Sequence, residues 1–210
     1  MRTTLLPAIK DQLAMLRNPL QLRLEKCENW QHISFMAALV ERMVPNYALF
    51  CAQTEFADPQ AFRNILDAVW ESQTVKTAKI DFERQLEKLE PLIPEANDHG
   101  IYLTYPAIDA CVALSQLLHA LLDRDEMLPI TLKVSQQSIH SVAQLEEAQT
   151  GLVVTDENQK SIEAICEEWD AQWAIFRVLK SAESRDVDMI KGIRQELREA
   201  GVSNLGLSVE

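Results

Sequence analysis

The segment from Tyr105 to Leu122 constrains the fold of this chain more strongly than any other stretch. From Ala110 onward it consists of alanine, cysteine, valine and leucine, apart from three polar residues. On a helix of about 100° per residue, the polar positions share one stripe of roughly 120°. They are Asp109, Ser115, Gln116, His119 and Asp123. Because every other face of this helix is apolar, we expect other helices to surround it.

Helical patterns cover most of the remaining chain, and several have recognisable ends. Asn18-Pro19 and Asp58-Pro59 each place a capping side chain before a proline at the first helical position. Gly151 and Gly201 stand where two later helices are expected to end. The sequence therefore predicts an all-α fold, a compact bundle of about eight or nine helices around a central apolar helix from Ile108 to Leu122.

Local signals also predict three boundaries within the bundle. Pro45 is expected to end the helix from Trp30 and to begin the next one, because proline lacks the N–H that a helix interior needs. A surface helix is expected from Val75 to Ile93. Thr155-Asp156-Glu157 is expected to cap a later helix. The outer face of that later helix is expected to hold Glu163, Glu167, Glu168 and Asp170.

Length and charge limit the classes of function. A chain of 210 residues can form one substantial hydrophobic core, so we expect a single domain over residues 1–210. A net charge of −12 repels phosphate, which disfavours ordinary duplex DNA or RNA and anionic lipid as partners. Local basic patches remain compatible with that charge. No uncharged run approaches the length of a membrane span. From the net charge we predict no nucleic-acid partner, and from the charge and the lack of such a run we predict no association with a membrane.

The cysteines indicate a reducing compartment. Cys27, Cys51, Cys111 and Cys166 form no C-x-x-C pair, and three of them lie among apolar neighbours, where a free thiol behaves as a small hydrophobic group. The first ten residues do not have the pattern of a secretory signal peptide. We therefore predict a cytoplasmic protein.

Asp109 and His119 are the candidate acid and base in this sequence. Both lie on the polar stripe of the central helix, so a cleft facing that stripe would bring them together with Gln116 and Tyr105 as ligand-binding residues. The alternative is structural. Asp109 follows Pro106 in the first turn of the helix, where the helix dipole stabilises a carboxylate by about 0.3–1 kcal/mol.

Two further pairs are candidate ligand-binding or metal sites. Trp169 and Trp173 are four residues apart and could stack a ligand, although such a pair is more often part of a core or a subunit interface. Glu28 and His32 have the same spacing and could share a metal ion, whereas an exposed helix pair is the commoner explanation. No Glu-x-x-His, Gly-rich phosphate loop or G-x-S-x-G motif is present, and we predict no cofactor.

Four blocks of the sequence resemble one family of bacterial proteins, the YjaG-like family of unknown function. The blocks are WQHISFMAALVERMVPNYALFCAQT (Trp30 to Thr54), YPAIDACVALSQL (Tyr105 to Leu117), EEWDAQWAIFRVL (Glu167 to Leu179) and REAGVSNLGL (Arg198 to Leu207). The similarity covers residues 15–207. It implies an all-helical cytoplasmic protein and brings no activity, cofactor or catalytic residue with it. Residues 1–14 resemble an N-terminal extension, so Met15 is an alternative start.

Two functions from different classes remain open. The first is a non-enzymatic helical protein that acts through protein–protein contacts or self-association. Abundant large apolar residues on many helices, an acidic surface and the lack of a catalytic signature favour it. The alternative is a small-molecule-binding protein or an enzyme with a cleft near Tyr105, Asp109, Gln116 and His119.

Overall fold

The computed structural model describes residues 20–208, in which every regular element is helical. The α-helices are α2 (Gln21–Leu24), α3 (Asn29–Thr54), α4 (Pro59–Thr74), α5 (Phe82–Leu89), α6 (Thr104–Leu122), α7 (Met127–Thr150), α8 (Glu163–Lys180) and α9 (Val187–Ala200). Three short 3-10 turns join them, at Glu90–Leu92, Arg124–Glu126 and Gln159–Ser161. The all-α prediction is confirmed. Asn18-Pro19, the extension at residues 1–14 and Met15 lie outside the described residues.

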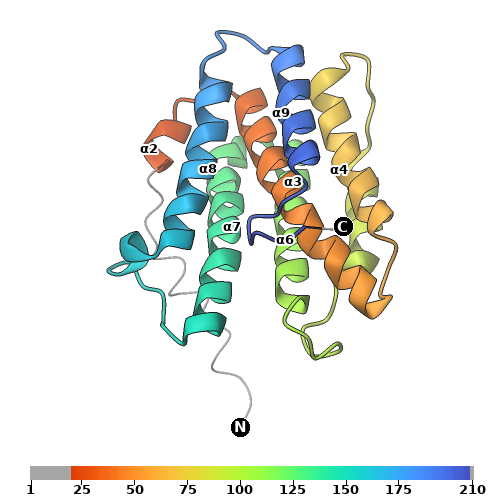
Figure 1. The fold of residues 1–210 in the computed structure, drawn as a ribbon. Coiled ribbons are helices and arrows are strands. Elements are labelled where there is room, and N and C mark those ends of the chain that lie inside the picture. The colour runs from red at the N-terminus through yellow and green to blue at the C-terminus, as the bar shows by residue number, and fades with distance from the viewer. Residues whose placement is uncertain (1–19, 209–210) are drawn as a thin grey trace.

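α6 and α3 together occupy the centre of the bundle. α6 corresponds to the predicted central helix, but it begins at Thr104 rather than Ile108, and it packs against α3, α5 and α7 on only part of its circumference. α3 is still more enclosed, because every residue from Trp30 to Glu41 is buried and the helix contacts α4, α6, α7, α8 and α9. Figure 1 shows α3 crossing the bundle diagonally in front of α6. α6 is also long and apolar enough to cross a membrane, but most of it is buried inside the fold.

The capping signals place several helix ends where the sequence predicts them. The Asp58 carboxylate accepts a hydrogen bond from the backbone N–H of Gln60, 2.9 Å away, at the start of α4. Gly151 and Gly201 follow α7 and α9 with φ of 71° and 61°, in the left-handed region that favours glycine. These ends are set by local chemistry alone.

Pro45 does not end a helix, contrary to the prediction. α3 continues through Pro45 to Thr54. An interior proline costs about 3 kcal/mol, because one N–H is missing and the ring crowds the preceding turn. The apolar residues on both sides of Pro45 are buried, and one continuous helix keeps both sets buried. We attribute the tolerance of Pro45 to this packing.

The predicted helix from Val75 to Ile93 is wrong in its extent. α4 ends at Thr74, and Val75 is extended. The guanidinium of Arg185 donates hydrogen bonds to the backbone carbonyls of Ser72 and Gln73 at the end of α4. α5 begins seven residues later, where the Asp81 carboxylate accepts from the backbone N–H of Arg84. A distant arginine therefore satisfies carbonyls at the end of α4.

The start of α8 and its outer face also differ from the prediction. Thr155-Asp156-Glu157 precedes a 3-10 turn rather than an α-helix, and extended Ile162 separates that turn from α8. Glu168 is buried, not on the outer face. Its carboxylate accepts hydrogen bonds from Arg42 at 2.6 Å and from Ser138 at 2.7 Å. Burial is possible because these partners compensate the lost hydration of the charge.

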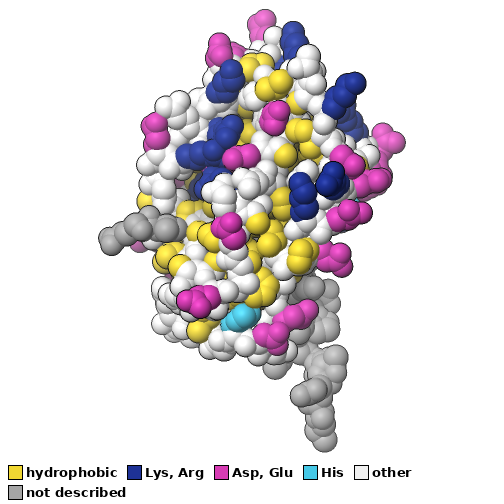
Figure 2. All heavy atoms as spheres, turned by 90° about the vertical axis from the view of Figure 1, so that its right-hand side faces the viewer, with side chains coloured by type: hydrophobic (Ala, Val, Ile, Leu, Met, Phe, Trp, Pro, Cys, Tyr) yellow, Lys and Arg dark blue, Asp and Glu magenta, His cyan; other side chains and the backbone are white. Residues whose placement is uncertain are grey.

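The segment after α9 returns to the centre of the bundle. Asn204 is buried there, and its backbone N–H donates to the carbonyl of Arg42 at 3.1 Å. Its side chain exchanges hydrogen bonds with Asn46 on α3 and with Ser138 on α7. The C-terminal segment thus joins α3 to α7 (Figure 1). The surface on the side of α4 carries charges of both signs around apolar side chains (Figure 2).

Candidate functional site

One face of α6 remains uncovered by the bundle, and it carries no formal charge. Its members are spaced alternately by three and four residues and are at least partly exposed: Tyr105, Ile108, Val112, Ser115, His119 and Leu122. Tyr105 and Leu122 are each 44% exposed. From Tyr105 to Leu122 the stripe is about 25 Å long, at a rise of about 1.5 Å per residue. Asp109, the single acidic residue of α6, is buried and does not belong to this stripe.

α7 continues this surface on one side of α6. Between Leu128 and Gln144, the positions of α7 that are not buried include one lysine, Lys133, and no acidic residue. We define the α6–α7 face as the six α6 residues above together with Leu128, Leu132, Lys133, Gln136, Gln137 and His140. By contrast, the exposed residues of α8 include Glu163, Glu167, Asp170, Arg177 and Lys180. The α6–α7 face therefore lacks the acidic side chains that the outer surface of α8 carries.

A hollow of about 340 Å³ borders the α6–α7 face where α5 packs beside α6. It is lined by Leu86, Glu87, Leu89, Glu90, Ile93, Ser115 and His119. The Nδ1 atom of His119 lies 2.8 Å from the backbone carbonyl of Ser115 in the preceding turn. Since a carbonyl can only accept, Nδ1 donates and Nε2 is left for a ligand or for solvent. The hollow thus has an apolar floor, acidic side chains and one imidazole.

Asp109 forms a polar cluster at the other end of the face, where α6 meets α7. The Gln137 amide donates to Oδ1 of Asp109 at 2.7 Å, and the Ser141 hydroxyl donates to Oδ2 at 2.7 Å. Nδ1 of His140 lies 3.8 Å from Oδ1 of Asp109. Asp109 is 6% exposed, so its carboxyl is almost wholly shielded from water.

Burial changes the protonation behaviour of this cluster. It raises the pKa of the Asp109 carboxyl from 3.8 to about 7, although the hydrogen bonds from Ser141 and Gln137 act in the opposite direction. Burial, with the nearby Asp109 charge, also raises the pKa of the Tyr102 hydroxyl. That hydroxyl is buried and has no hydrogen-bond partner among the residues that the structure describes. The cluster therefore contains the Asp109 carboxyl, which titrates near neutral pH, and the nearby Tyr102 hydroxyl, whose hydrogen-bonding capacity is not used by the described residues.

The structure does not bring the predicted acid and base together. Asp109 and His119 are ten residues apart on one helix, which separates them by about 15 Å along its axis. Asp109 faces α7, whereas His119 lies in the hollow beside α5. Gln116 is partly buried, with its amide oxygen unpartnered, and Tyr105 lies 6.4 Å from Tyr102 between ring centroids. The partners that Asp109 does have, on α7, were not singled out in the sequence.

The two tryptophans belong to separate apolar clusters. Trp169 packs against the cluster that contains Ile139 and Ile162, and its indole N–H is buried without a partner. Trp173 packs against the main core, with the ring of Phe176 edge-on at 5.5 Å and the guanidinium of Arg177 5.9 Å from its ring centroid. Both are partly buried, and each packs against a different apolar cluster.

Glu28 and His32 also point to different surroundings. His32 is buried, and its Nδ1 lies 3.0 Å from the Thr131 hydroxyl on α7. Burial lowers the pKa of His32 to about 4. Glu28 is exposed at the start of α3, where its carboxylate accepts from the indole N–H of Trp30 at 2.9 Å. The exposed-pair interpretation is therefore wrong for His32. Within residues 20–208, no group of three or more His, Cys, Asp or Glu side chains is placed to hold a metal ion.

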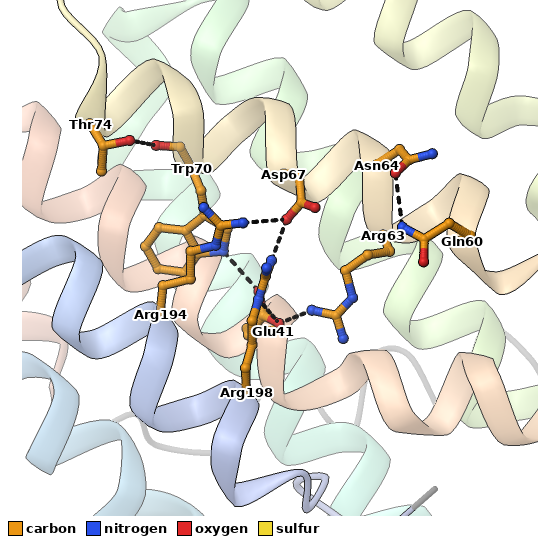
Figure 3. Close-up of polar contacts among 9 residues, drawn as sticks. All are labelled: Glu41, Gln60, Arg63, Asn64, Asp67, Trp70, Thr74, Arg194 and Arg198. Atoms are coloured by element: carbon orange, nitrogen blue, oxygen red, sulfur yellow. Dashed lines mark hydrogen bonds and ion pairs between the residues drawn. The ribbon is translucent and has the colours of Figure 1, made fainter.

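A buried carboxylate on α3 was missed by the sequence analysis. Glu41 accepts hydrogen bonds from the indole N–H of Trp70 at 2.9 Å and from Nε of Arg198 at 3.0 Å, and it pairs with Arg63. Figure 3 shows these groups converging from α4 and α9, with Asp67 beside them. The signal was available, because Glu41 lies within a strongly apolar helix and a buried charge there requires partners.

Comparisons with known proteins agree on one family. The family model described as "Protein of unknown function (DUF416)" matches residues 19–208. The chain is 55% identical over 196 residues to "Uncharacterized protein YjaG" of Salmonella typhimurium, which covers 93% of this chain and 100% of that protein. It is 45% identical over 193 residues to an uncharacterized protein of Haemophilus influenzae, covering 91% of this chain and 98% of that protein.

A solved structure has the same fold. The crystal structure of a DUF416 family protein from Shewanella baltica OS155 superposes with a TM-score of 0.84 and 31% sequence identity, covering 92% of this chain and 100% of that one. The resemblance found in the sequence blocks is confirmed. With a family match over residues 19–208 and relatives at 55% identity, this chain belongs to the DUF416 family, which includes the YjaG proteins.

Proposed function

We propose that this protein acts through protein–protein contacts and that a second copy of the chain covers the α6–α7 face. The observation that supports this proposal is the uncharged stripe of α6, spaced by three and four residues over its whole length. That spacing is the one by which two helices pack side by side. Tyr105, Ile108, Val112 and Leu122 supply the apolar surface for such a contact.

Charge favours a second copy as the partner. Two molecules of net charge −12 repel each other wherever their acidic surfaces meet. The α6–α7 face avoids that repulsion, because its residues include Lys133 and no acidic side chain. A symmetric pair places the same patch of both copies in contact, so an uncharged patch suits it. Apolar burial then supplies roughly 25 cal/mol for each Å² removed from water.

Light scattering of the purified protein tests this proposal. We expect a molar mass of two chains for the wild type, and a single chain for Leu122→Glu, because a carboxylate on the stripe would be buried in the contact. Val178→Glu on α8 is the matched control, since Val178 is also 44% exposed but lies outside the α6–α7 face. A wild type that is monomeric at every concentration tested contradicts the proposal.

A second candidate is a small-molecule-binding protein or an enzyme whose site lies at Asp109. The unpartnered Tyr102 hydroxyl next to a carboxyl that titrates near pH 7 favours it. His119 is not part of such a site, because it lies nearly three helical turns away, about 15 Å along the axis. A compound that raises the melting temperature of the wild type but not of Asp109→Asn would support this candidate, and equal stabilisation of both would oppose it.

We infer a cytoplasmic location from the cysteines. All four lie in the described residues, and all are free thiols. Free thiols persist in reducing compartments. Fractionation of the native cell tests this inference: recovery in the periplasm or with the membrane contradicts it.

A further inference from the structure

A group of basic side chains lies where α4 and α9 pack together. Arg63 on α4 and Arg194 and Arg198 on α9 surround two carboxylates, Glu41 and Asp67 (Figure 3). Three guanidinium groups against two carboxylates leave one positive charge. On the side of the molecule that includes α4, Lys and Arg side chains lie in several groups with Asp and Glu side chains among them (Figure 2). The excess of one guanidinium makes this group of residues locally positive on a protein whose net charge is −12.

The carboxylates do not use all the donors of these arginines. A guanidinium has five N–H donors. Within residues 20–208, the Arg194 side chain makes a single hydrogen bond, from Nη2 to Asp67 at 3.1 Å, and the Arg63 side chain makes a single one, from Nη1 to Glu41. Their side chains are 30% and 25% exposed. The pairs with buried Glu41 and with partly exposed Asp67 thus hold the remaining N–H groups in place, and these N–H groups stay reachable from solvent.

A hollow of about 280 Å³ lies along this part of α9. Lys191, Arg194, Gln195 and Arg198 line it, at positions i, i+3, i+4 and i+7 of the helix, so four donor side chains share one face. Glu199 closes one end, where its carboxylate accepts from the Gln195 amide at 2.7 Å. Three cations and one anion therefore line the hollow.

We propose that this hollow binds the phosphate group of a small molecule. Guanidinium groups match the planar, multidentate geometry of phosphate oxygens, and an ammonium adds a point charge. The pairs with Glu41 and Asp67 orient the guanidiniums before a ligand arrives, which reduces the entropy lost on binding. The acidic charge of the rest of the chain does not prevent this, because salt screens exposed charges beyond about 8 Å.

Thermal unfolding in sodium phosphate and in sodium chloride of equal ionic strength and pH tests the proposal. We expect phosphate to raise the unfolding temperature of the wild type with a saturable concentration dependence. Lys191→Gln/Arg194→Gln should weaken the apparent affinity about tenfold or more, since it removes two charged donors and leaves the partners of Glu41 in place. Arg84→Gln/Lys88→Gln on α5 removes the same charges elsewhere and should respond as the wild type does.

Two outcomes overturn the proposal. One is an equal effect of chloride and phosphate on the wild type, and the other is an unchanged phosphate response in the α9 double variant. Glycerol 3-phosphate, measured in parallel, shows whether the ligand is a phosphate ester or free phosphate. A higher apparent affinity for glycerol 3-phosphate than for inorganic phosphate identifies a phosphate ester as the ligand. An equal apparent affinity identifies the free ion. Both results support a phosphate site. Lys191→Gln alone should also weaken the apparent affinity for phosphate, but to a smaller degree. Because this variant keeps the contact between Arg194 and Asp67, its effect cannot come from the loss of that contact.

Discussion

At the scale of single residues, burial determines how Asp109 titrates. The pKa of its carboxyl is about 7 in the folded protein and 3.8 ordinarily, so the folded state holds the proton more tightly. Its contribution to stability is then greatest below about pH 4 and is lost as pH rises towards 7. Asp109→Asn keeps the shape of the side chain without its charge. The free energy of unfolding of this variant, relative to that of the wild type, should therefore increase by up to about 1.4 kcal/mol per pH unit as pH rises from about 4 to 7.

Urea unfolding of both proteins at pH 5 and at pH 8 measures this difference. Asp170→Asn, on the exposed surface of α8, is the control and should parallel the wild type at both values. If Asp109→Asn also parallels the wild type, the carboxyl is not destabilised by burial.

His32 gives the opposite pH dependence. Burial lowers its pKa from 6.5 to about 4, so the unfolded chain binds the proton more readily. Stability associated with neutral His32 is present above pH 6.5 and is lost as pH falls towards 4. His32→Gln should remove this loss, which unfolding at pH 7 and at pH 4.5 detects as a smaller drop than in the wild type. An equal drop in both proteins contradicts the assignment.

The sequence identified Asp109 but not its environment. Its hydrogen-bond partners Gln137 and Ser141 follow 28 and 32 residues later, on α7. Single-sequence periodicity places residues around one helix axis, and it does not determine which neighbouring helix each face meets. For the same reason Glu168 was placed on the outside: its acidic neighbours resemble a solvated face, whereas its partners come from α3 and α7.

At the scale of the element, helix ends were predictable where local chemistry decides them. α4, α7 and α9 begin or end at the expected capping aspartate or glycine. The end of α3 and the end of α4 differ from the prediction because distant groups decide them, through the buried surroundings of Pro45 and the bonds from Arg185 to the carbonyls of Ser72 and Gln73. Propensity is a weak constraint when packing opposes it.

The start of α4 gives a direct test of local control. Asp58→Ala removes the side chain that accepts from the backbone N–H of Gln60, and the loss of a helix N-cap costs roughly 1 kcal/mol. Asp58→Ser retains an acceptor and should recover most of that stability. Denaturant unfolding at pH 7 measures both variants, and equal losses in the two would show that the cap does not stabilise α4.

At the scale of the whole molecule, the distribution of charge separates two kinds of surface. The α6–α7 face lacks acidic residues, whereas the surface where α4 and α9 pack together, with Arg63, Arg194 and Arg198, is locally basic on an acidic protein. The sequence predicted the burial of α6 but not its uncovered stripe, because Ile108 and Val112 are as apolar as the buried residues beside them. Which apolar positions remain uncovered depends on where α5 and α7 pack, and this is decided only in three dimensions.

Thiol labelling at Ser115 tests most directly whether a second copy covers the α6–α7 face. Ser115→Cys places a thiol in the middle of the stripe, and Val178→Cys places one on α8 as the control. Labelling is followed by mass spectrometry of the peptide that contains each thiol, over a range of protein concentrations. We predict that the thiol at position 115 reacts more slowly as concentration rises, while the thiol at position 178 does not. Equal and concentration-independent labelling of both would contradict the account.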